Sequence, residues 1–577
     1  MISVLTPLPV LLPLLGAACT LLVGHHPRTQ RTISIAVLTA VLAVSVALLL
    51  QADAGGPTAV SVGGWPVPLG IVLVVDRLSA LMLVVASTVA LGVLWFAVGQ
   101  GSADGSEETP LSIFHPTFLV LIAGVSNAFL AGDLFNLYVG FEILLMASYV
   151  LLTLGGSAPR VRAGITYVVV SLTSSLIFLA AIALIYASTG TLTMAQLAIR
   201  LGELPDGMQV LLQSMLLIAF SIKAAVFPLS AWLPDSYPTA PAPVTAVFAG
   251  LLTKVGVYAI IRTQTLLFPG GALDDLLMWA ALATMVIGIL GAVAQTDIRR
   301  MLSFTLVSHI GYMVFGIALG TAAGLSGAIF YVAHHIAIQT TLFLVAGLVE
   351  RQGGSTSVNR LGGLAKLSPL LAVLFFVPAM NLAGIPPFSG FIGKLGLLQA
   401  GVADGSQLAL TLVVGGVVTS LLTLLAIARV WTRAFWRPAG QEPLADTAAA
   451  AASDAGAEVR EPVPVGAGDV EDPEDAEDAA QPTVRQAAWS AAWRRHEDVA
   501  TAGTSRPAER TVAEGALRPL PGVMVGATAV MVAVTVALTV IAGPLYGYTD
   551  GAARDLLERT PYIEAVFDGP VPAEEGE

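Results

Sequence analysis

Four ionisable side chains lie deep inside long apolar runs, and they are the residues best placed to do chemistry. They are Glu142, Lys223, Lys254 and Lys394. A charged residue at the centre of a bilayer costs roughly 2.5–3.5 kcal/mol, so a chain keeps one there only with a partner, a water-filled cavity or a function. An apolar medium favours loss of the ammonium proton, so a buried lysine can act as a proton carrier. The alternative is a buried ion pair that only fixes helix packing, but one glutamate cannot neutralise three lysines.

Three histidines add groups that titrate near neutral pH. His309 lies in LVSHIGYMVF, and His334 and His335 lie in FYVAHHIAIQTTLFL. A histidine can pass a proton between its two ring nitrogens, so together with the lysines these residues predict a proton relay. Each histidine taken alone is more typical of a hydrogen-bonded core residue. A zinc site is disfavoured, because the chain has no HExxH motif and these runs contain no thiols. No metal and no cofactor are predicted.

Prolines interrupt the runs that carry two of the lysines. Pro228 follows Lys223 by five residues, and Pro386 and Pro387 precede Lys394. Proline removes a helix hydrogen bond, and interrupted helices are tolerated at membrane depth only where they line a protein-buried or watery cavity. Similar interruptions in two halves of a chain mark ion paths in transporters with inverted repeats. KAAVFPLSAWLP and GIPPFSGFIGK are such a pair, in predicted spans 7 and 12.

The elements that must position these residues are membrane helices. The 577 residues are 56% hydrophobic and 11% charged, whereas soluble domains carry about 25% charged residues. Open sheet edges cannot face lipid, and the apolar runs are too long for barrel strands. The sequence therefore predicts an all-α polytopic membrane protein with about 14 transmembrane helices, although 13 or 15 would also fit. The spans are 3–24, 31–51, 70–99, 115–131, 135–154, 163–188, 208–231, 242–264, 273–295, 300–320, 324–350, 368–401, 406–435 and 519–544.

Charge placement predicts the orientation and a solvated insertion. Arginines and lysines follow odd-numbered spans, which makes that side cytoplasmic and places both termini outside. Much of the net charge of −12 comes from residues 438–518, which are rich in Ala, Asp, Glu, Pro and Gly. Such a composition cannot bury enough apolar surface to fold, so we predict a disordered acidic cytoplasmic linker over 438–518.

Several charged residues at span ends favour structural roles. Asp133 begins span 5 and is predicted to be a helix N-cap or an interfacial acid. Asp76 stands beside Arg77, and a local ion pair between them is expected. Arg262 is an isolated exception to the charge rule.

Three motif blocks, in order and spacing, resemble the antiporter-like subunits shared by respiratory complex I and Mrp-type Na⁺/H⁺ antiporters. The blocks are FEILLMASYVLL, SIKAAVFPLSAWLPDSYPTAPAPVTAVFAGLLTKVGVYAIIR and NLAGIPPFSGFIGK. The resemblance covers about residues 65–435. PTAPAPVTAVFAGLLTKVGVYAIIR and the terminal TPYIEAV are most similar to the D-subunit group of Mrp antiporters. Gln339 departs from the pattern, because the family commonly has a lysine near this position.

The resemblance implies two inverted five-helix repeats, with discontinuous helices 7 and 12. The implied organisation is helices 1–3 in residues 1–110, a first repeat (helices 4–8) in 111–265, a second repeat (helices 9–13) in 266–437, the linker 438–518, helix 14 in 519–545 and a C-terminal tail in 546–577. Glu142 and Lys223 would form the modulating acid–base pair. Lys254, His334 and His335 would continue the polar axis to Lys394 at the exit half-channel.

The resemblance also implies partners, ions and a location. The partners would be the other Mrp subunits A, B, C, E, F and G and the lipid bilayer, and the ions would be H⁺ and Na⁺. The chain would lie in the cell membrane of a prokaryote and would be a transporter subunit, not an enzyme.

Two other functions remain open at this point. A proton-pumping subunit of a complex I-type oxidoreductase or a related hydrogenase would use almost the same local machinery, because fold does not decide coupling. A polytopic enzyme such as a membrane glycosyltransferase would need paired acids or a metal motif at the membrane face, and the sequence offers no strong one.

Overall fold

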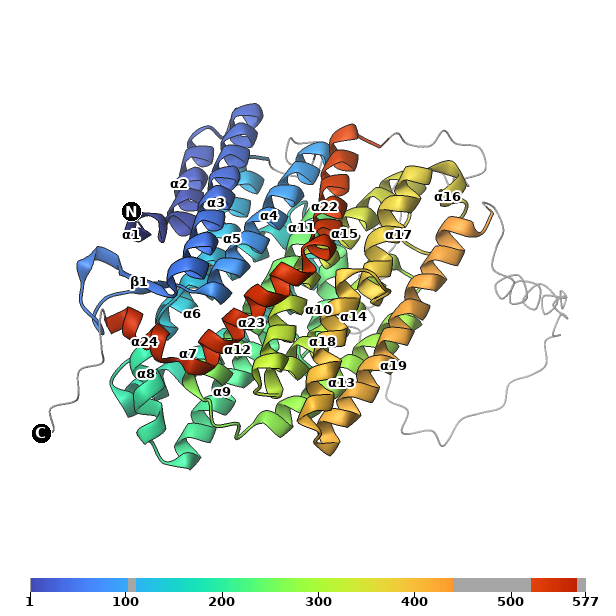
Figure 1. Ribbon diagram of the computed structural model, residues 1–577. Coiled ribbons are helices and arrows are strands. Elements are labelled where there is room, and N and C mark those ends of the chain that lie inside the picture. The colour runs from blue at the N-terminus through green and yellow to red at the C-terminus, as the bar shows by residue number, and fades with distance from the viewer. Residues whose placement is uncertain (1, 102–110, 439–519, 568–577) are drawn as a thin grey trace, which may run out of the picture. The chain divides into compact units, whose positions relative to one another are not determined.

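Helices make up most of the chain in the computed structural model, which describes residues 2–101, 111–438 and 520–567 (Figure 1). Within these ranges, 12 helices are long and apolar enough to cross a membrane. They are α3 (Pro27–Gly55), α4 (Arg77–Gln100), α5 (Leu111–Leu130), α6 (Leu134–Thr153), α7 (Ala158–Thr189), α9 (Asp206–Ala224), the continuous run from α11 to η5 (Ala242–Leu267), α13 (Asp274–Ala294), α14 (Ile298–Ala318), α15 (Ala322–Gly353), α19 with η6 (Gln407–Trp436) and α22 (Gly522–Val540). The all-α polytopic prediction is confirmed.

Shorter helices complete the described part of the chain. They are α1 (Ile2–Leu5), α2 (Leu8–Leu22), η1 (Val62–Gly64), α8 (Met194–Arg200), η2 (Leu201–Glu203), α10 (Trp232–Ser236), η3 (Tyr237–Thr239), α16 (Leu364–Leu367), α17 (Pro369–Ala383), α18 (Ser389–Asp404), α23 (Ala542–Glu558) and α24 (Thr560–Phe567). Two of them, α2 and α17, are apolar and 15 residues long. Together with the 12 longer helices they are consistent with about 14 spans. The predicted linker lies outside the described residues.

A short hairpin precedes α4, where the sequence predicted a helix from residue 70 onward and no strands. Strands β1 (Thr58–Ser61) and β2 (Val72–Val75) pair antiparallel, with Thr58 opposite Val75. The helix begins later because Asp76 and Ser79 form a capping box. The Asp76 carboxylate accepts from Ser79 N–H at 2.8 Å, and the Ser79 hydroxyl accepts from Asp76 N–H at 2.9 Å. This reciprocal cap fixes the first turn and leaves the preceding residues extended.

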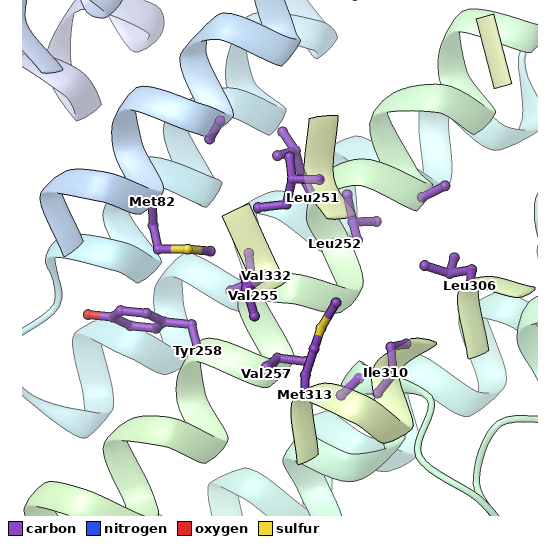
Figure 2. Close-up of a cluster of buried hydrophobic side chains, with 14 of the residues drawn as sticks. Met82, Leu251, Leu252, Val255, Val257, Tyr258, Leu306, Ile310, Met313 and Val332 are labelled. Atoms are coloured by element: carbon purple, nitrogen blue, oxygen red, sulfur yellow. The ribbon is translucent and has the colours of Figure 1, made fainter. Parts of the chain in front are cut away.

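Two helices lie at the centre of the bundle. In the run from α11 to η5 and in α15, every residue of the most apolar window is buried, whereas in α3 and α19 a third or fewer are buried. Figure 2 shows this core, which contains Val255 and Leu251 from the first run, Val332 of α15 and Ile310 of α14, with Val255 beside Val332. A helix that is buried all round lies in the interior. Polar residues on these helices therefore face protein.

Both predicted helix interruptions are present. The gap between α9 and α10 contains Pro228, and the gap between α17 and α18 contains Pro386 and Pro387. Ala225 and Gly384, which directly follow α9 and α17, have left-handed φ values of 59° and 83°. Each chain segment thus leaves its helix inside the bundle, and the last carbonyl groups of the broken helix are free to accept other hydrogen bonds.

Candidate functional site

Glu142 and Lys223 meet at a serine hydroxyl. Ser175 of α7 donates to Glu142 Oε1 at 2.5 Å and accepts from Lys223 Nζ at 3.0 Å. The Lys223 ammonium also donates to the carbonyl of Ser171 at 3.2 Å and lies 5.6 Å from the centre of the Phe141 ring. In the described part of the chain, no ion pair joins Glu142 directly to Lys223. Helices α6, α7 and α9 therefore share one polar centre.

A small cavity lies beside Lys223 at the break that follows α9. It has room for about one water molecule, and its lining includes Lys223, Ser171, Tyr167 and Tyr237. The hydroxyl of Tyr237 is buried and has no hydrogen-bond partner among the described residues. Because buried polar groups are normally hydrogen-bonded, the cavity has the chemistry to hold water next to the lysine.

Lys254 lies in the fully buried central helix. Its ammonium donates to the carbonyl of Ala249 at 2.6 Å, within the π-helical turn η4 (Phe248–Leu252). Two residues further along, Gly256 packs against the end of α9. A Cβ atom on Gly256 would lie 2.6 Å from the backbone nitrogen of Ala224, the residue after Lys223. The helix that carries Lys254 therefore touches the end of the helix that carries Lys223.

Lys394 occupies the second helix break. Its ammonium donates to the carbonyls of Leu382 and Ala383 at 3.2 Å each. These two groups belong to the last turn of α17, where no further helical N–H can reach them, and the C-terminus of a helix favours a cation. The ammonium also lies 5.2 Å from the centre of the Tyr312 ring of α14. The break thus supplies the polar partners that a lysine at this depth requires.

The three histidines form one buried cluster between α14 and α15. The rings of His309 and His335 are 5.2 Å apart, and the hydroxyl of Tyr331 lies 3.0 Å from Nδ1 of His309. Nδ1 of His334 lies 3.0 Å from the hydroxyl of Ser389, the first residue of α18. This contact links the histidine cluster to the second helix break.

Lys254 and Lys394 both lie within electrostatic range of this cluster. Lys254 interacts electrostatically with His309 and His335, and Lys394 interacts with His309, His334 and His335. Among the described residues, no direct hydrogen bond joins Lys223 to Lys254. The predicted residues therefore form two groups, Glu142 with Lys223 and Lys254 with the histidines and Lys394, whose helices touch at Gly256.

At position 339, where the resemblance led us to expect a lysine, the chain has a neutral polar residue in the core. Gln339 of α15 is buried, and its amide donates to the carbonyl of Leu302 at 2.7 Å. Among the described residues, no group of three or more His, Cys, Asp or Glu side chains is arranged to hold a metal ion.

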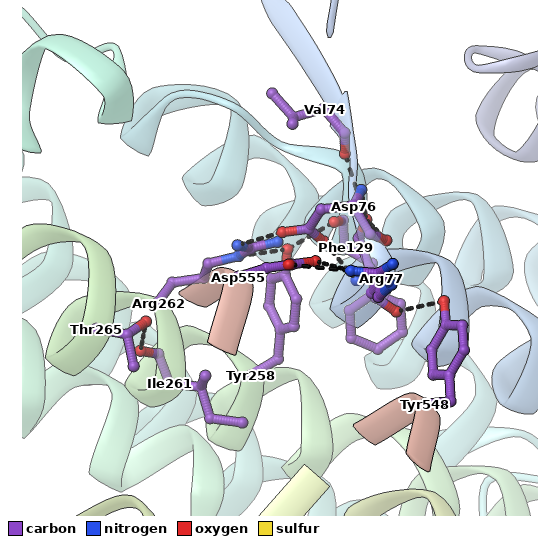
Figure 3. Close-up of polar contacts among 11 residues, drawn as sticks. Val74, Asp76, Arg77, Phe129, Tyr258, Ile261, Arg262, Thr265, Tyr548 and Asp555 are labelled. Atoms are coloured by element: carbon purple, nitrogen blue, oxygen red, sulfur yellow. Dashed lines mark hydrogen bonds and ion pairs between the residues drawn. The ribbon is translucent and has the colours of Figure 1, made fainter. Parts of the chain in front are cut away.

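A second polar network lies where α4 begins and α12 (Thr253–Arg262) ends (Figure 3). Oδ2 of Asp76 lies 2.6 Å from the guanidinium of Arg262, and both side chains are almost fully buried. Nε of Arg262 donates to the hydroxyl of Tyr258, which donates to the carbonyl of Phe129 at 2.7 Å. Burial by itself would raise the pKa of Asp76, but the Arg262 guanidinium and the hydrogen bonds from Ser79 together more than offset it, so the pKa is lowered.

The expected local pair between Asp76 and Arg77 is wrong. Arg77 points elsewhere and binds Asp555 of α23 at 2.7 Å and Asp53 of α3 at 3.2 Å. Adjacent residues at a helix start point in different directions, so neighbours in sequence need not pair. The expectation for Asp133 is confirmed, because its carboxylate caps α6 by accepting from Asn136 N–H at 2.6 Å. Burial raises the pKa of Asp133 to about 6.

The C-terminal helices contact both the second helix break and the polar network around Arg262. Thr539 of α22 accepts from the N–H of Ser389 at 3.0 Å, beside the second break. Along α23, Thr549 lies 3.1 Å from Ser326 of α15. In α24, which contains the whole TPYIEAV motif, the ring of Tyr562 lies 5.3 Å from the guanidinium carbon of Arg262. The segment from 546 to 567, expected to be a tail, is thus helical and packed against the bundle.

Sequence reasoning missed the neutral polar residues that contact the charged groups, such as Ser175, which bonds to Glu142 and Lys223. Ser171, Ser174 and Ser175 recur at i, i+3 and i+4, so they share one face of α7 within an apolar span. That spacing indicates a polar helix face and could have been recognised in the sequence. Tyr331 and Ser389 gave no comparable signal, since each takes its role from a contact with another helix.

A family model described as NADH:quinone oxidoreductase/Mrp antiporter, TM matches residues 131–423. The D subunit of the Na⁺/H⁺ antiporter of Alkalihalophilus pseudofirmus is 42% identical over 435 residues, which are 74% of this chain and 86% of the relative. The protein of the same name from Bacillus subtilis is 37% identical over 440 residues, 76% of this chain and 88% of the relative.

Two solved structures share the fold of this chain. A chain in the structure of the Mrp complex from Dietzia sp. DQ12-45-1b is 35% identical, with a TM-score of 0.81 over 98% of this chain and 99% of that chain. A chain of respiratory complex I from Thermus thermophilus is 22% identical, with a TM-score of 0.71 over 96% of this chain and all of that chain, and shares the fold. The chain belongs to the NADH:quinone oxidoreductase/Mrp antiporter membrane family, in the group of Na⁺/H⁺ antiporter D subunits.

Proposed function

We propose that protons cross the membrane through this chain along Glu142, Lys223, Lys254, His334, His335 and Lys394. The chain is a membrane subunit of a multisubunit Na⁺/H⁺ antiporter in the bacterial plasma membrane, a transporter component and not an enzyme. Its partners are other subunits of the Mrp complex. The proton route within the subunit is the part that the following observations support.

The choice of lysine at the buried positions carries the proposal. The chain has four lysines, at positions 223, 254, 366 and 394, and all but the exposed Lys366 are buried in the bundle. Arginine remains charged at every accessible pH, whereas lysine can release its proton. Among the described residues, the buried cations that have a carboxylate partner are arginines, Arg262 with Asp76 and Arg299 with Glu350. Lysine is thus used where, in the described part of the chain, no carboxylate lies within ion-pair distance.

The partners of these lysines suit a group that gains and loses a proton. Each ammonium is held by backbone carbonyl oxygens, those of Ser171, Ala249, or Leu382 with Ala383. Such dipoles stabilise the ammonium without a fixed opposite charge, so removal of the proton leaves no unpaired carboxylate behind. The cavity at Lys223 and the imidazoles between Lys254 and Lys394 supply carriers for the intervening steps.

We also propose that the two predicted five-helix repeats, residues 111–265 and 266–437, are the units of this route. Each range contains one broken helix, α9–α10 in the first and α17–α18 in the second, and each break lies beside a relay lysine. Lys223 stands just before its break, and Lys394 stands after its break.

Arginine substitutions test the route directly. Lys223→Arg, Lys254→Arg and Lys394→Arg keep the positive charge but prevent release of the proton. In everted membrane vesicles that contain the whole complex, each should reduce sodium-dependent proton flux to background, while Lys366→Arg should transport like the wild type. Co-purification of the other subunits checks assembly. Wild-type flux in an assembled Lys254→Arg complex would reject the relay and leave only a charge at that position.

The subunits that co-purify also distinguish the remaining alternative. Recovery of the Mrp subunits A, B, C, E, F and G supports the antiporter assignment. Flavin and iron–sulfur subunits in their place would identify a redox-driven proton pump.

A further inference from the structure

We infer that Ser175 is a proton-bridging residue, whose hydroxyl connects Glu142 to Lys223 and controls when a proton passes between them. The inference rests on the proposed proton route and adds to it a residue that carries no charge.

The geometry places this hydroxyl on a continuous hydrogen-bond path between the two charged groups. It donates to Glu142 Oε1 at 2.5 Å and accepts from Lys223 Nζ at 3.0 Å. Ser175 is buried, Lys223 is buried and Glu142 is half-buried. A hydroxyl has one proton to donate and lone pairs to accept, so both of its functions are used here.

The local structure holds the hydroxyl in place. Ser174, the preceding residue, donates from its own hydroxyl to the carbonyl of Ala219 in α9 at 2.8 Å. The carbonyl of Ser171, one turn earlier, accepts from Lys223. One face of α7 thus contacts the helix that carries Lys223 through three serines, and the third of them also reaches Glu142.

The proton step balances without any further reactant. An N–H bond of the Lys223 ammonium breaks as its proton moves to Ser175 Oγ, and the original O–H bond of Ser175 breaks as that proton moves to Glu142 Oε1. The products are a neutral amine, a neutral carboxylic acid and a serine hydroxyl whose proton now faces the amine. The total charge of the three groups is unchanged, and the reverse shift restores the starting state.

The bridge also explains why the acid and the base do not bind each other directly. Two opposite charges in contact in a medium of low dielectric constant attract each other strongly and would hold the proton on the lysine. An intervening hydroxyl separates the charges by two hydrogen bonds and so weakens this attraction. The pair can then exchange a proton as the neighbouring groups change charge.

Three variants of the full complex test the inference. Ser175→Ala removes the bridge and only one buried oxygen atom, Ser175→Thr restores a hydroxyl, and Ser174→Ala removes a hydroxyl from the same helix interface that bonds to the Ala219 carbonyl. Sodium-dependent proton flux in everted vesicles is measured as a function of pH, with assembly checked by co-purification. A hydrogen bond to a charged group contributes about 1.5–3 kcal/mol, so Ser175→Ala should reduce flux roughly ten- to hundredfold and displace the pH profile by about one unit.

The expected pattern is loss in Ser175→Ala, recovery in Ser175→Thr, and less than about threefold loss with an unmoved pH profile in Ser174→Ala. Equal effects of Ser175→Ala and Ser174→Ala, or an unmoved pH profile in Ser175→Ala, would overturn the bridge and reduce Ser175 to a packing role. Lys223→Arg is measured in parallel. If that variant transports normally, the proposed route itself fails; if it is inactive while Ser175→Ala behaves as the wild type, only the bridge fails.

Discussion

Replacing Asp76 with asparagine removes one charge from the buried network of Figure 3 and leaves its other contacts possible. Asparagine caps a helix about as well as aspartate, so the start of α4 should persist. The guanidinium of Arg262, 4% exposed, would lose its carboxylate partner, 6% exposed. Breaking a buried pair by removal of one partner costs about 3–5 kcal/mol, because the remaining charge stays buried and uncompensated.

Asp555→Asn is the matched control, since it breaks a pair of similar geometry nearer the surface. Arg77 and Asp555 are 24% and 22% exposed, and Arg77 keeps Asp53 as a second partner. Surface pairs contribute about 0–1 kcal/mol. Asp76→Asn should therefore be more destabilising than Asp555→Asn by at least about 2 kcal/mol.

The assay is thermal unfolding of the purified chain in detergent, followed by tryptophan fluorescence for the wild type and both variants. A lowered carboxyl pKa contributes stability that is present above the unfolded value of 3.8 and lost as the pH falls through the folded value. The difference between wild type and Asp76→Asn should therefore be constant from about pH 5 to pH 8. The reasoning is refuted if Asp76→Asn melts no earlier than Asp555→Asn.

Three further predictions concern the second helix break and one helix cap. Lys394→Leu should abolish sodium-dependent proton flux in vesicles, whereas Lys394→Glu should retain a reduced flux, because a carboxyl group can still take and release a proton; equal flux in the two variants would contradict this. Gly384→Ala places a side chain at φ 83° and a Cβ atom 3.0 Å from Lys394 Cδ, whereas the Cβ atom of Gly405→Ala, at φ 73°, meets nothing within 4 Å. Each variant should lose about 1 kcal/mol of unfolding free energy, measured by thermal unfolding. Only Gly384→Ala should also lose proton flux. Burial raises the pKa of Asp133 to about 6, so the folded state binds the proton more tightly than the unfolded state. Wild-type stability should therefore fall relative to Asp133→Asn by about 1.4 kcal/mol between pH 5 and pH 8; parallel melting temperatures would contradict the shift.

The sequence by itself determined the fold class and the candidate site residues. Apolar runs of membrane length must be helical because lipid offers no hydrogen bonds to the backbone. Lys223, Lys254 and Lys394 stand out in such runs because charge is costly there, and prolines mark the two breaks because proline cannot continue a helix bond pattern. Each of these inferences uses a property of the residue itself, or of its immediate neighbours in the chain.

Only the tertiary structure decided which of these residues meet and through what. Asp76 binds the distant Arg262, and not the adjacent Arg77, because helix packing brings their ends together. Ser175 reaches both Glu142 and Lys223 because α6, α7 and α9 converge at one level of the bundle. The hydroxyls, carbonyls and rings that complete the site are common residue types whose position in the sequence gives no sign of a partner. Their roles arise from long-range packing, and the spacing of residues along one chain segment cannot specify it.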